Sequence, residues 1–127
     1  MSQKQPPEYT DGWGELIRAH RSYIGVSQRT MAEKLKMNER SLSDIEVGRR
    51  SCPPGFLNAV QEVSQDFYSD VAKLIEKADA ALEDSNAAPD VWFEVPTTDN
   101  PQREWCRAVV ARAAVDGGNI MPILALD

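Results

Sequence analysis

The side chains that most often carry catalytic or metal chemistry are few and widely spaced in this chain of 127 residues. His20, the single histidine, has no cysteine or second histidine at metal-ligand spacing, so we expect it to be a half-buried structural residue. Cys52 and Cys106 are far apart in the sequence and predict two ordinary reduced thiols. No glycine-rich phosphate loop and no pattern typical of a serine, histidine and aspartate triad is present. We therefore expect no catalytic residues, no metal and no cofactor.

Polar side chains suited to binding are concentrated instead between Trp13 and Arg50. This stretch divides into three short predicted helices. The first helix ends near Gly25 and has one apolar stripe at helical spacing, formed by Leu16, Ile17 and Tyr23. Ser27 and Asn38 are placed to cap the second and third helices, because their side-chain oxygens can accept from free amides of the first turn. The buried residues expected in these two helices are Met31, Ala32, Leu35, Leu42 and Ile45.

A tight turn through Lys36 and Met37 separates the second helix from the third, and Gly48 supplies the left-handed residue that ends the third. This short spacing is typical of two crossed helices. The stretch resembles the Cro/repressor type of helix-turn-helix domain, found in phage repressors and many bacterial regulators. The segments that carry the resemblance are WGELIRxxR, GVSQ, MAEKL, LSDIEVG and the RR that follows, in the family's order and without a gap. Lys36 departs from the family, which usually has glycine there, and should be strained.

The resemblance implies a DNA-binding surface on the second and third helices. Gln28 corresponds to the family's phosphate-binding position, and Glu39, Arg40 and Asp44 fall where its recognition helix faces base edges. Arg40 is suited to guanine and Glu39 to the cytosine amino group. Phosphates would repel Asp44, which leaves three roles open: discriminating between bases, orienting a neighbouring arginine, or pointing away. The DNA-binding residues that the resemblance predicts are Gln28, Arg29, Glu39, Arg40, Ser41, Ser43, Asp44, Arg49 and Arg50.

Two further interpretations give residues of this stretch structural or solvent-exposed roles and no contact with DNA. Charged residues on a short helix usually form only a solvated face, and this is the alternative for each residue of the predicted DNA-binding surface. Glu46 is expected to be structural, holding an arginine of the first helix, rather than to contact a base.

The formal net charge of −6 is unevenly distributed along the chain. Residues 1–60 contain nine Lys or Arg against seven Asp or Glu, a balance of +2, whereas residues 61–127 contain five against thirteen, a balance of −8. The acidic composition therefore does not exclude nucleic acid as a partner of the first half. Because non-specific affinity increases with the number of phosphates neutralised, this weak positive charge predicts modest non-specific binding.

Beyond Pro53 and Pro54, which suit the first turn of a helix, apolar residues recur at steps of three and four as far as Leu82. The pattern fits one helix from about residue 54 to 84, or two helices with a break near residues 64–66. The distal apolar stripe of this pattern could form an interface with a second subunit, or it could pack against the chain's own C-terminal segment. We expect some of each. That stripe comprises Phe67, Val71, Leu74 and Ala78.

The C-terminal part predicts a polar linker over 83–90, then a strand, a helix and a strand. The strands are VWFEV (91–95) and IMPILAL (120–126), with Pro122 at an edge, and the helix spans 101–115. The helix is expected to bury Trp105, Val109, Val110 and Ala113. Parallel strands joined by a helix normally belong to a larger sheet, so a partner subunit is expected to complete this one. In architecture alone, the segment distantly resembles the small dimerising domain of regulators associated with phage anti-CRISPR genes.

These observations predict a mainly α fold with two domains. Residues 1–65 form the helix-turn-helix bundle, and residues 66–127 form a C-terminal dimerisation domain made of a helix plus a β-α-β element. The dimer interface is expected to include Phe67, Val71, Leu74, Ala78, Trp92, Trp105 and Ile123.

The function that follows is a cytoplasmic, sequence-specific transcriptional regulator, a repressor that binds an inverted-repeat operator in double-stranded DNA as a homodimer. No apolar run approaches the roughly 18 to 20 residues of a membrane helix, so no membrane partner is expected. The alternative is an antitoxin or adaptor whose acidic C-terminal half binds a protein partner and which uses DNA binding for autoregulation. The residues leave open the operator sequence, the inducing ligand and any additional binding of RNA.

Overall fold

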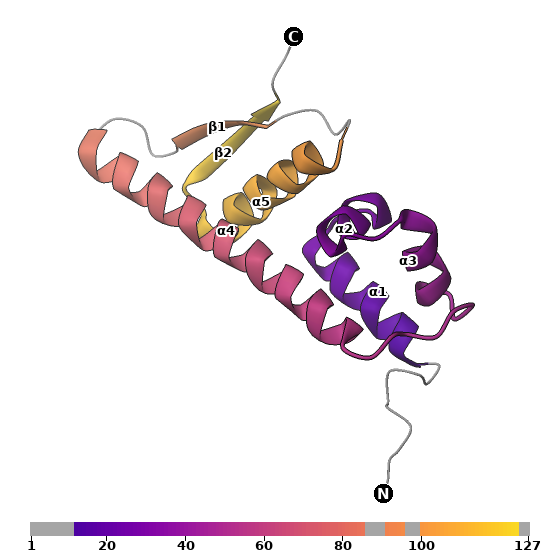
Figure 1. Cartoon of the computed structure of the whole chain (residues 1–127). Coiled ribbons are helices and arrows are strands. Elements are labelled where there is room, and N and C mark those ends of the chain that lie inside the picture. Colours follow the sequence, from indigo (N-terminus) through magenta and orange to yellow (C-terminus); the bar gives the residue numbers. More distant parts are fainter. Residues whose placement is uncertain (1–11, 86–90, 96–99, 125–127) are drawn as a thin grey trace, which may run out of the picture. The chain divides into compact units, whose positions relative to one another are not determined.

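The computed structural model describes residues 12–85, 91–95 and 100–124 (Figure 1). Within these ranges the fold is mainly α, as predicted: three short helices, a long helix, and then a β-α-β element with parallel strands. The chain divides between Gln65 and Asp66 into two compact units, each described by itself below. The elements are α1 (Gly12–Ile24), α2 (Gln28–Leu35), α3 (Glu39–Glu46), α4 (Phe56–Ser85), β1 (Val91–Val95), α5 (Pro101–Gly117) and β2 (Ile120–Leu124).

The predicted caps of the second and third helices, and the predicted glycine ends of the first and third, lie at helix ends in the structure. Ser27 Oγ accepts from the Thr30 amide at 3.2 Å, and Asn38 Oδ1 accepts from the Ser41 amide at 2.8 Å. Gly25 and Gly48 adopt positive φ angles of 80° and 83°. Both predicted caps and both predicted glycine ends are therefore confirmed.

The core of the first unit confirms most of the predicted apolar faces. Leu35 is only half-buried, and two residues of the predicted α1 stripe, Leu16 and Tyr23, are exposed, which makes that part of the prediction wrong. Each precedes a buried isoleucine by one residue, and one helical step turns a side chain by about 100° away from its neighbour. The buried apolar residues of the unit are Ile17, Ile24, Val26, Met31, Ala32, Leu42, Ile45, Cys52, Val60 and Val63.

Gly14 permits the close approach of α1 to the end of α3. A β-carbon built on Gly14 would overlap the backbone carbonyl oxygen of Ile45 and would lie 3.1 Å from that of Glu46. Backbone atoms cannot move aside as a flexible side chain can, so any larger residue would push the two helices apart. The close packing of α3 against α1 thus depends on a glycine inside α1, although glycine is otherwise unfavourable inside a helix.

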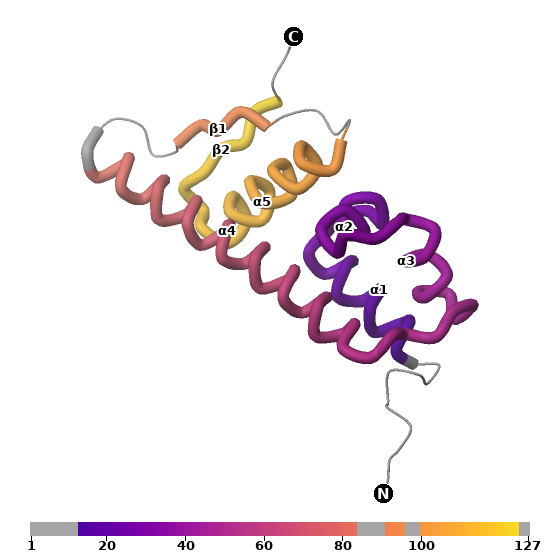
Figure 2. Tube along the Cα trace, viewed as in Figure 1, coloured from indigo at the N-terminus to yellow at the C-terminus, as the bar shows by residue number. Residues whose placement is uncertain are grey.

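Helix α4 is continuous from Phe56 to Ser85, so the one-helix alternative is correct and no break occurs near residues 64–66 (Figure 2). Pro53 and Pro54 precede the helix instead of forming its first turn. The reason is Gly55, whose φ of 81° places it outside the helix, while the Phe56 amide closes a turn on the Pro53 carbonyl at 3.1 Å.

No described helix is both long enough and apolar enough to cross a membrane.

In the second unit β1 and β2 are parallel, with Val91 opposite Ile120 and Val95 opposite Leu124. Helix α5 connects them and packs on both strands. Asn100 Oδ1 caps α5 by accepting from the Arg103 amide at 2.9 Å, Pro101 takes the first position, and Gly118 ends the helix with a φ of 79°. The β-α-β prediction is confirmed for these residues. Residues 83–85 of the predicted linker belong to α4, and 86–90 and 125–126 lie outside the described residues.

The predicted dimer-interface residues differ in their surroundings. Phe67, Val71, Ala78 and Trp105 are buried, and the Phe67 and Trp105 rings meet edge to face with centroids 5.3 Å apart. These four are core residues, which favours packing against the chain's own C-terminal segment over a subunit seam. Leu74 and Ile123 are half-buried, and Trp92 is 63% exposed.

Candidate nucleic-acid interface

The turn between α2 and α3 fixes how the two helices follow each other. The Met37 amide donates to the Ala32 carbonyl at 3.0 Å and the Lys36 amide to the Glu33 carbonyl at 3.2 Å, which is the Schellman pattern of a helix end. Lys36 adopts a left-handed conformation, with φ 59° and ψ 46°. It is the single non-glycine residue with positive φ among the residues described. The predicted strain at Lys36 therefore has a structural basis.

Helix α3 buries one face and exposes the other. Leu42, Ile45 and Glu46 are buried, and the helix packs against both α1 and α2. Glu39 and Arg40 are exposed on the opposite side, and residues four positions further along, Ser43 and Asp44, share that side. The result is a short helix that is packed on one side and has a polar face that no described residue covers completely.

Six of the nine predicted DNA-binding residues line one shallow hollow of about 350 Å³. It joins the beginning of α2 to the exposed face of α3, and its lining residues are Gln28, Glu39, Arg40, Ser43, Asp44 and Arg49. Arg29 and Arg50 are exposed but do not line the hollow, and Ser41 is half-buried outside it. The hollow contains two arginines and two acids, so it offers hydrogen-bond donors and acceptors without a large net charge.

Asp44 and Arg49 form an ion pair at the end of α3. Arg49 Nη1 lies 2.9 Å from Asp44 Oδ1, and the Asp44 side chain is 18% exposed whereas that of Arg49 is 69% exposed. The backbone amides of Arg49 and Arg50 also donate to the Asp44 carbonyl, at 2.8 and 3.1 Å. Of the three roles left open for Asp44, this geometry favours orienting a neighbouring arginine.

Glu46 connects the three short helices, as its predicted structural role requires. Arg21 of α1 donates to both Glu46 carboxylate oxygens, from Nε at 2.8 Å and Nη2 at 2.9 Å, and its Nη1 donates to the Val26 carbonyl at 3.0 Å. Gln28 Nε2 donates to Glu46 Oε1 at 2.9 Å. The Gln28 amide group is therefore positioned at the first residue of α2 by a buried carboxylate, with one N–H still available to a ligand.

The residues that most often carry metal or thiol chemistry lie apart from this hollow. The described residues include no group of three histidine, cysteine or acidic side chains that could hold a metal ion. Both cysteines are free thiols, Cys52 buried and Cys106 exposed. His20 is half-buried in α1, as expected of a structural histidine.

No family model, curated protein or solved structure matches the chain. The resemblance of residues 13–50 to helix-turn-helix domains therefore stays a prediction from the sequence.

Val47, the C-cap residue that directly follows α3, was missed by the sequence reasoning. It follows Arg40 by seven residues, which is two helical turns, and it is 60% exposed. The signal was available, because an apolar residue at this spacing from Arg40 must share its side of the helix. Sequence reasoning gave weight to charged side chains and left this valine out, although an apolar group can contact a thymine methyl.

Proposed function

We propose that this chain is a sequence-specific DNA-binding regulator of transcription that acts through the exposed face of α3. The observation that carries the proposal is the packing of α3. The helix is capped by Asn38 and buried along Leu42 and Ile45. It is exposed at Glu39 and Arg40, and at the C-cap residue Val47 that follows it. A helix held in this way on a supporting helix has the dimensions to enter the major groove and to present its first turns to base edges.

Each side chain of this face has a role that its chemistry favours. Arg40 donates two hydrogen bonds to a guanine, and Glu39 accepts from the amino group of a cytosine. Ser41 and Ser43 are short donors at the same surface. Gln28, Arg29, Arg49 and Arg50 contact phosphates and fix the position of the helix along the groove.

The modest charge of the first half indicates that specificity comes from contacts with bases more than from attraction to the backbone. Residues 1–60 have a balance of only +2. Each phosphate contact adds about 0.9 to the slope of log affinity against log salt. A surface with few cations therefore binds non-specific duplexes weakly, and its affinity for them depends little on the salt concentration. We therefore expect a large ratio of specific to non-specific affinity.

A homodimer is part of the proposal, and the sheet of the second unit supports it. Within the described residues the sheet has only two strands, so each strand has one edge without a strand partner. Trp92 and Met121 are cross-strand neighbours on its outer face and are 63% and 42% exposed. An exposed tryptophan on a small, incomplete sheet favours association with a second copy.

A two-fold dimer would place two copies of α3 in successive major grooves, so its operator would be an inverted repeat with half-sites about 10 base pairs apart. Binding over a promoter would repress transcription by excluding the polymerase. This role belongs to the cytoplasm.

The charge balance of −8 in residues 61–127 favours a second candidate function. In this alternative the acidic C-terminal half binds a protein partner that has a basic surface, and the DNA-binding half regulates the chain's own gene.

The test is a binding titration of the full chain with a duplex selected by it and with variants of that duplex. Replacing Arg40 by alanine should weaken binding to the selected duplex by about 1 to 3 kcal/mol and relax the preference at one base pair. Arg107→Ala, which removes an exposed arginine of α5, is the matched control and should leave the preference unchanged. An equal loss on every duplex tested would contradict a base-reading role for Arg40.

A further inference from the structure

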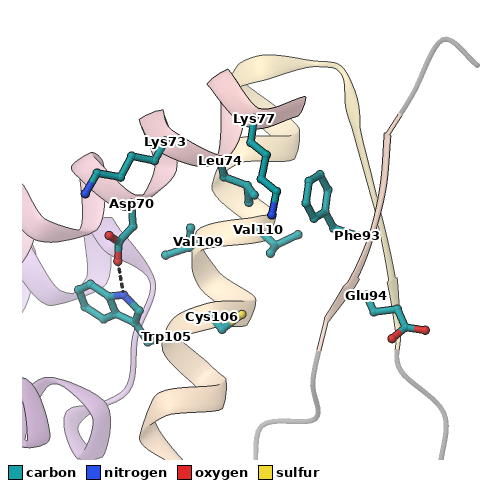
Figure 3. A pocket seen from close by; sticks show the side chains of 10 residues that line it. All are labelled: Asp70, Lys73, Leu74, Lys77, Phe93, Glu94, Trp105, Cys106, Val109 and Val110. Atoms are coloured by element: carbon teal, nitrogen blue, oxygen red, sulfur yellow. Dashed lines mark hydrogen bonds between the residues drawn. The ribbon is translucent and has the colours of Figure 1, made fainter. Parts of the chain in front are cut away.

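A cavity of about 430 Å³ that is widely open to solvent lies within the second unit, between α4, β1 and α5. Its walls are mainly apolar, with Leu74 from α4, Phe93 from β1 and Val110 from α5 (Figure 3). The volume is within the range of about 300 to 1,000 Å³ that is usual for small-molecule sites. No residue of the candidate DNA-binding face lines this cavity.

The positive charge of the cavity comes from two exposed lysines. Lys77 extends across the cavity toward Phe93, and its Nζ lies 6.0 Å from the centroid of that ring (Figure 3). Lys73 lines the same side, one helical turn earlier on α4. Among the described residues, no carboxylate lies within 4.0 Å of either ammonium group. An ammonium group above an apolar wall, without an acidic partner, favours a ligand that brings the negative charge.

The two acidic residues of the cavity do not pair with Lys77. Asp70 keeps its negative charge, but it accepts a hydrogen bond from Trp105 Nε1 at 2.9 Å and lies two helical turns from Lys77 along α4. Glu94 follows Phe93 directly in β1, so its side chain is on the opposite face of the strand, and it points away from Lys77 (Figure 3).

We propose that this cavity binds a small amphipathic anion, an aromatic or branched aliphatic carboxylate. The apolar body of the ligand packs against Leu74, Phe93 and Val110, and its carboxylate pairs with Lys77. The site is independent of the proposed contacts with DNA, because its lining residues all belong to the second unit. Failure of one proposal therefore leaves the other untouched.

Cys106 provides a local reporter, because it lines the cavity and is exposed, whereas Cys52 is buried. The experiment follows alkylation of Cys106 in the full chain by N-ethylmaleimide, with peptide mapping to separate the two cysteines. The probe is 1-naphthaleneacetate, and its neutral isostere 1-naphthaleneacetamide is the ligand control. We expect the acetate to slow alkylation of Cys106 in a saturable way and the amide to bind about tenfold more weakly.

Lys77→Met keeps the apolar stem of the side chain and removes its charge. It should weaken protection by the acetate about tenfold and leave protection by the amide unchanged, while Lys36→Met, in the first unit, should change neither. Circular dichroism of each variant verifies that it is folded. Absence of saturable protection, equal protection by the two compounds, or an unchanged Lys77→Met variant would overturn the proposal. Protection that rises with protein concentration and without any probe would also overturn it, because a second copy would then occupy the cavity.

Discussion

Among its single residues, the candidate DNA-binding face contains side chains suited to contact DNA and acidic side chains that position them. Arg40 is exposed, but Arg49 is paired with Asp44 at 2.9 Å and Gln28 with Glu46 at 2.9 Å. Holding a long side chain before binding reduces the conformational entropy lost when it meets a phosphate. The acidic residues of this face therefore have a positioning role that their charge alone does not suggest.

Replacing Asp44 by asparagine should make this role measurable. The change releases Arg49 and removes a negative charge from the surface proposed to face phosphates, so binding to a random-sequence duplex should become about threefold tighter at low salt. Discrimination between the selected duplex and the random one should fall at the same time. Asp116→Asn, an exposed residue of α5, controls for the change in net charge, and fluorescence anisotropy measures both affinities. Weaker binding to the random duplex would contradict this role.

Lys36 stores strain that glycine would relieve. Its left-handed conformation costs roughly 1 to 2 kcal/mol, and the greater flexibility of glycine in the unfolded chain costs up to about 1 kcal/mol. Lys36→Gly should therefore raise the free energy of unfolding by about 0.5 to 1 kcal/mol. Lys34→Gly, two residues earlier inside α2, should instead lower it by about 1 kcal/mol. Urea denaturation followed by circular dichroism distinguishes the two, and a destabilised Lys36→Gly variant would show that the turn is not strained.

At the scale of elements, Glu46 connects α1, α2 and α3 through Arg21 and Gln28. The Glu46 side chain is 1% exposed and that of Arg21 is 15% exposed, so removing one partner leaves the other charge largely out of water. Glu46→Ala should lower the free energy of unfolding by about 3 kcal/mol.

The double replacement Arg21→Met with Glu46→Leu should recover most of that loss, because apolar side chains of similar volume do not need a partner. The same urea denaturation measures the single and double variants. If the double variant is no more stable than Glu46→Ala, the ion pair is not the cause of the loss.

The elements also show how far the sequence could predict this molecule. Caps and helix ends depend on local chemistry, so Ser27, Asn38 and Gly48 could be assigned from their neighbours alone. The hollow that joins α2 to α3 required the family resemblance, because charge spacing by itself is equally typical of a solvated face. Tertiary contacts could not be assigned in this way. Nothing local to Phe67 distinguishes a subunit seam from the contact with Trp105, and nothing local to Gly14 indicates the backbone of Ile45 beside it.

At the scale of the whole molecule, the proposal requires that a second copy use the exposed sheet. Trp92→Ser should convert a dimer into a monomer at micromolar concentration without loss of helix content, because the indole is 63% exposed and does not contribute to the core. Val115→Ser removes another exposed apolar side chain of the same unit and should leave the mass unchanged. Sedimentation equilibrium measures the mass, and a dimer that survives the Trp92 replacement would place the interface elsewhere.

Sequence recognition by α3 can be tested by selecting bound duplexes from a random DNA pool with the full chain. We expect enrichment of an inverted repeat with half-sites about 10 base pairs apart, each containing a guanine whose selection is lost in the Arg40→Ala variant. A pool that stays random after repeated rounds, with a chain that is folded by circular dichroism, would contradict the claim that α3 recognises a DNA sequence.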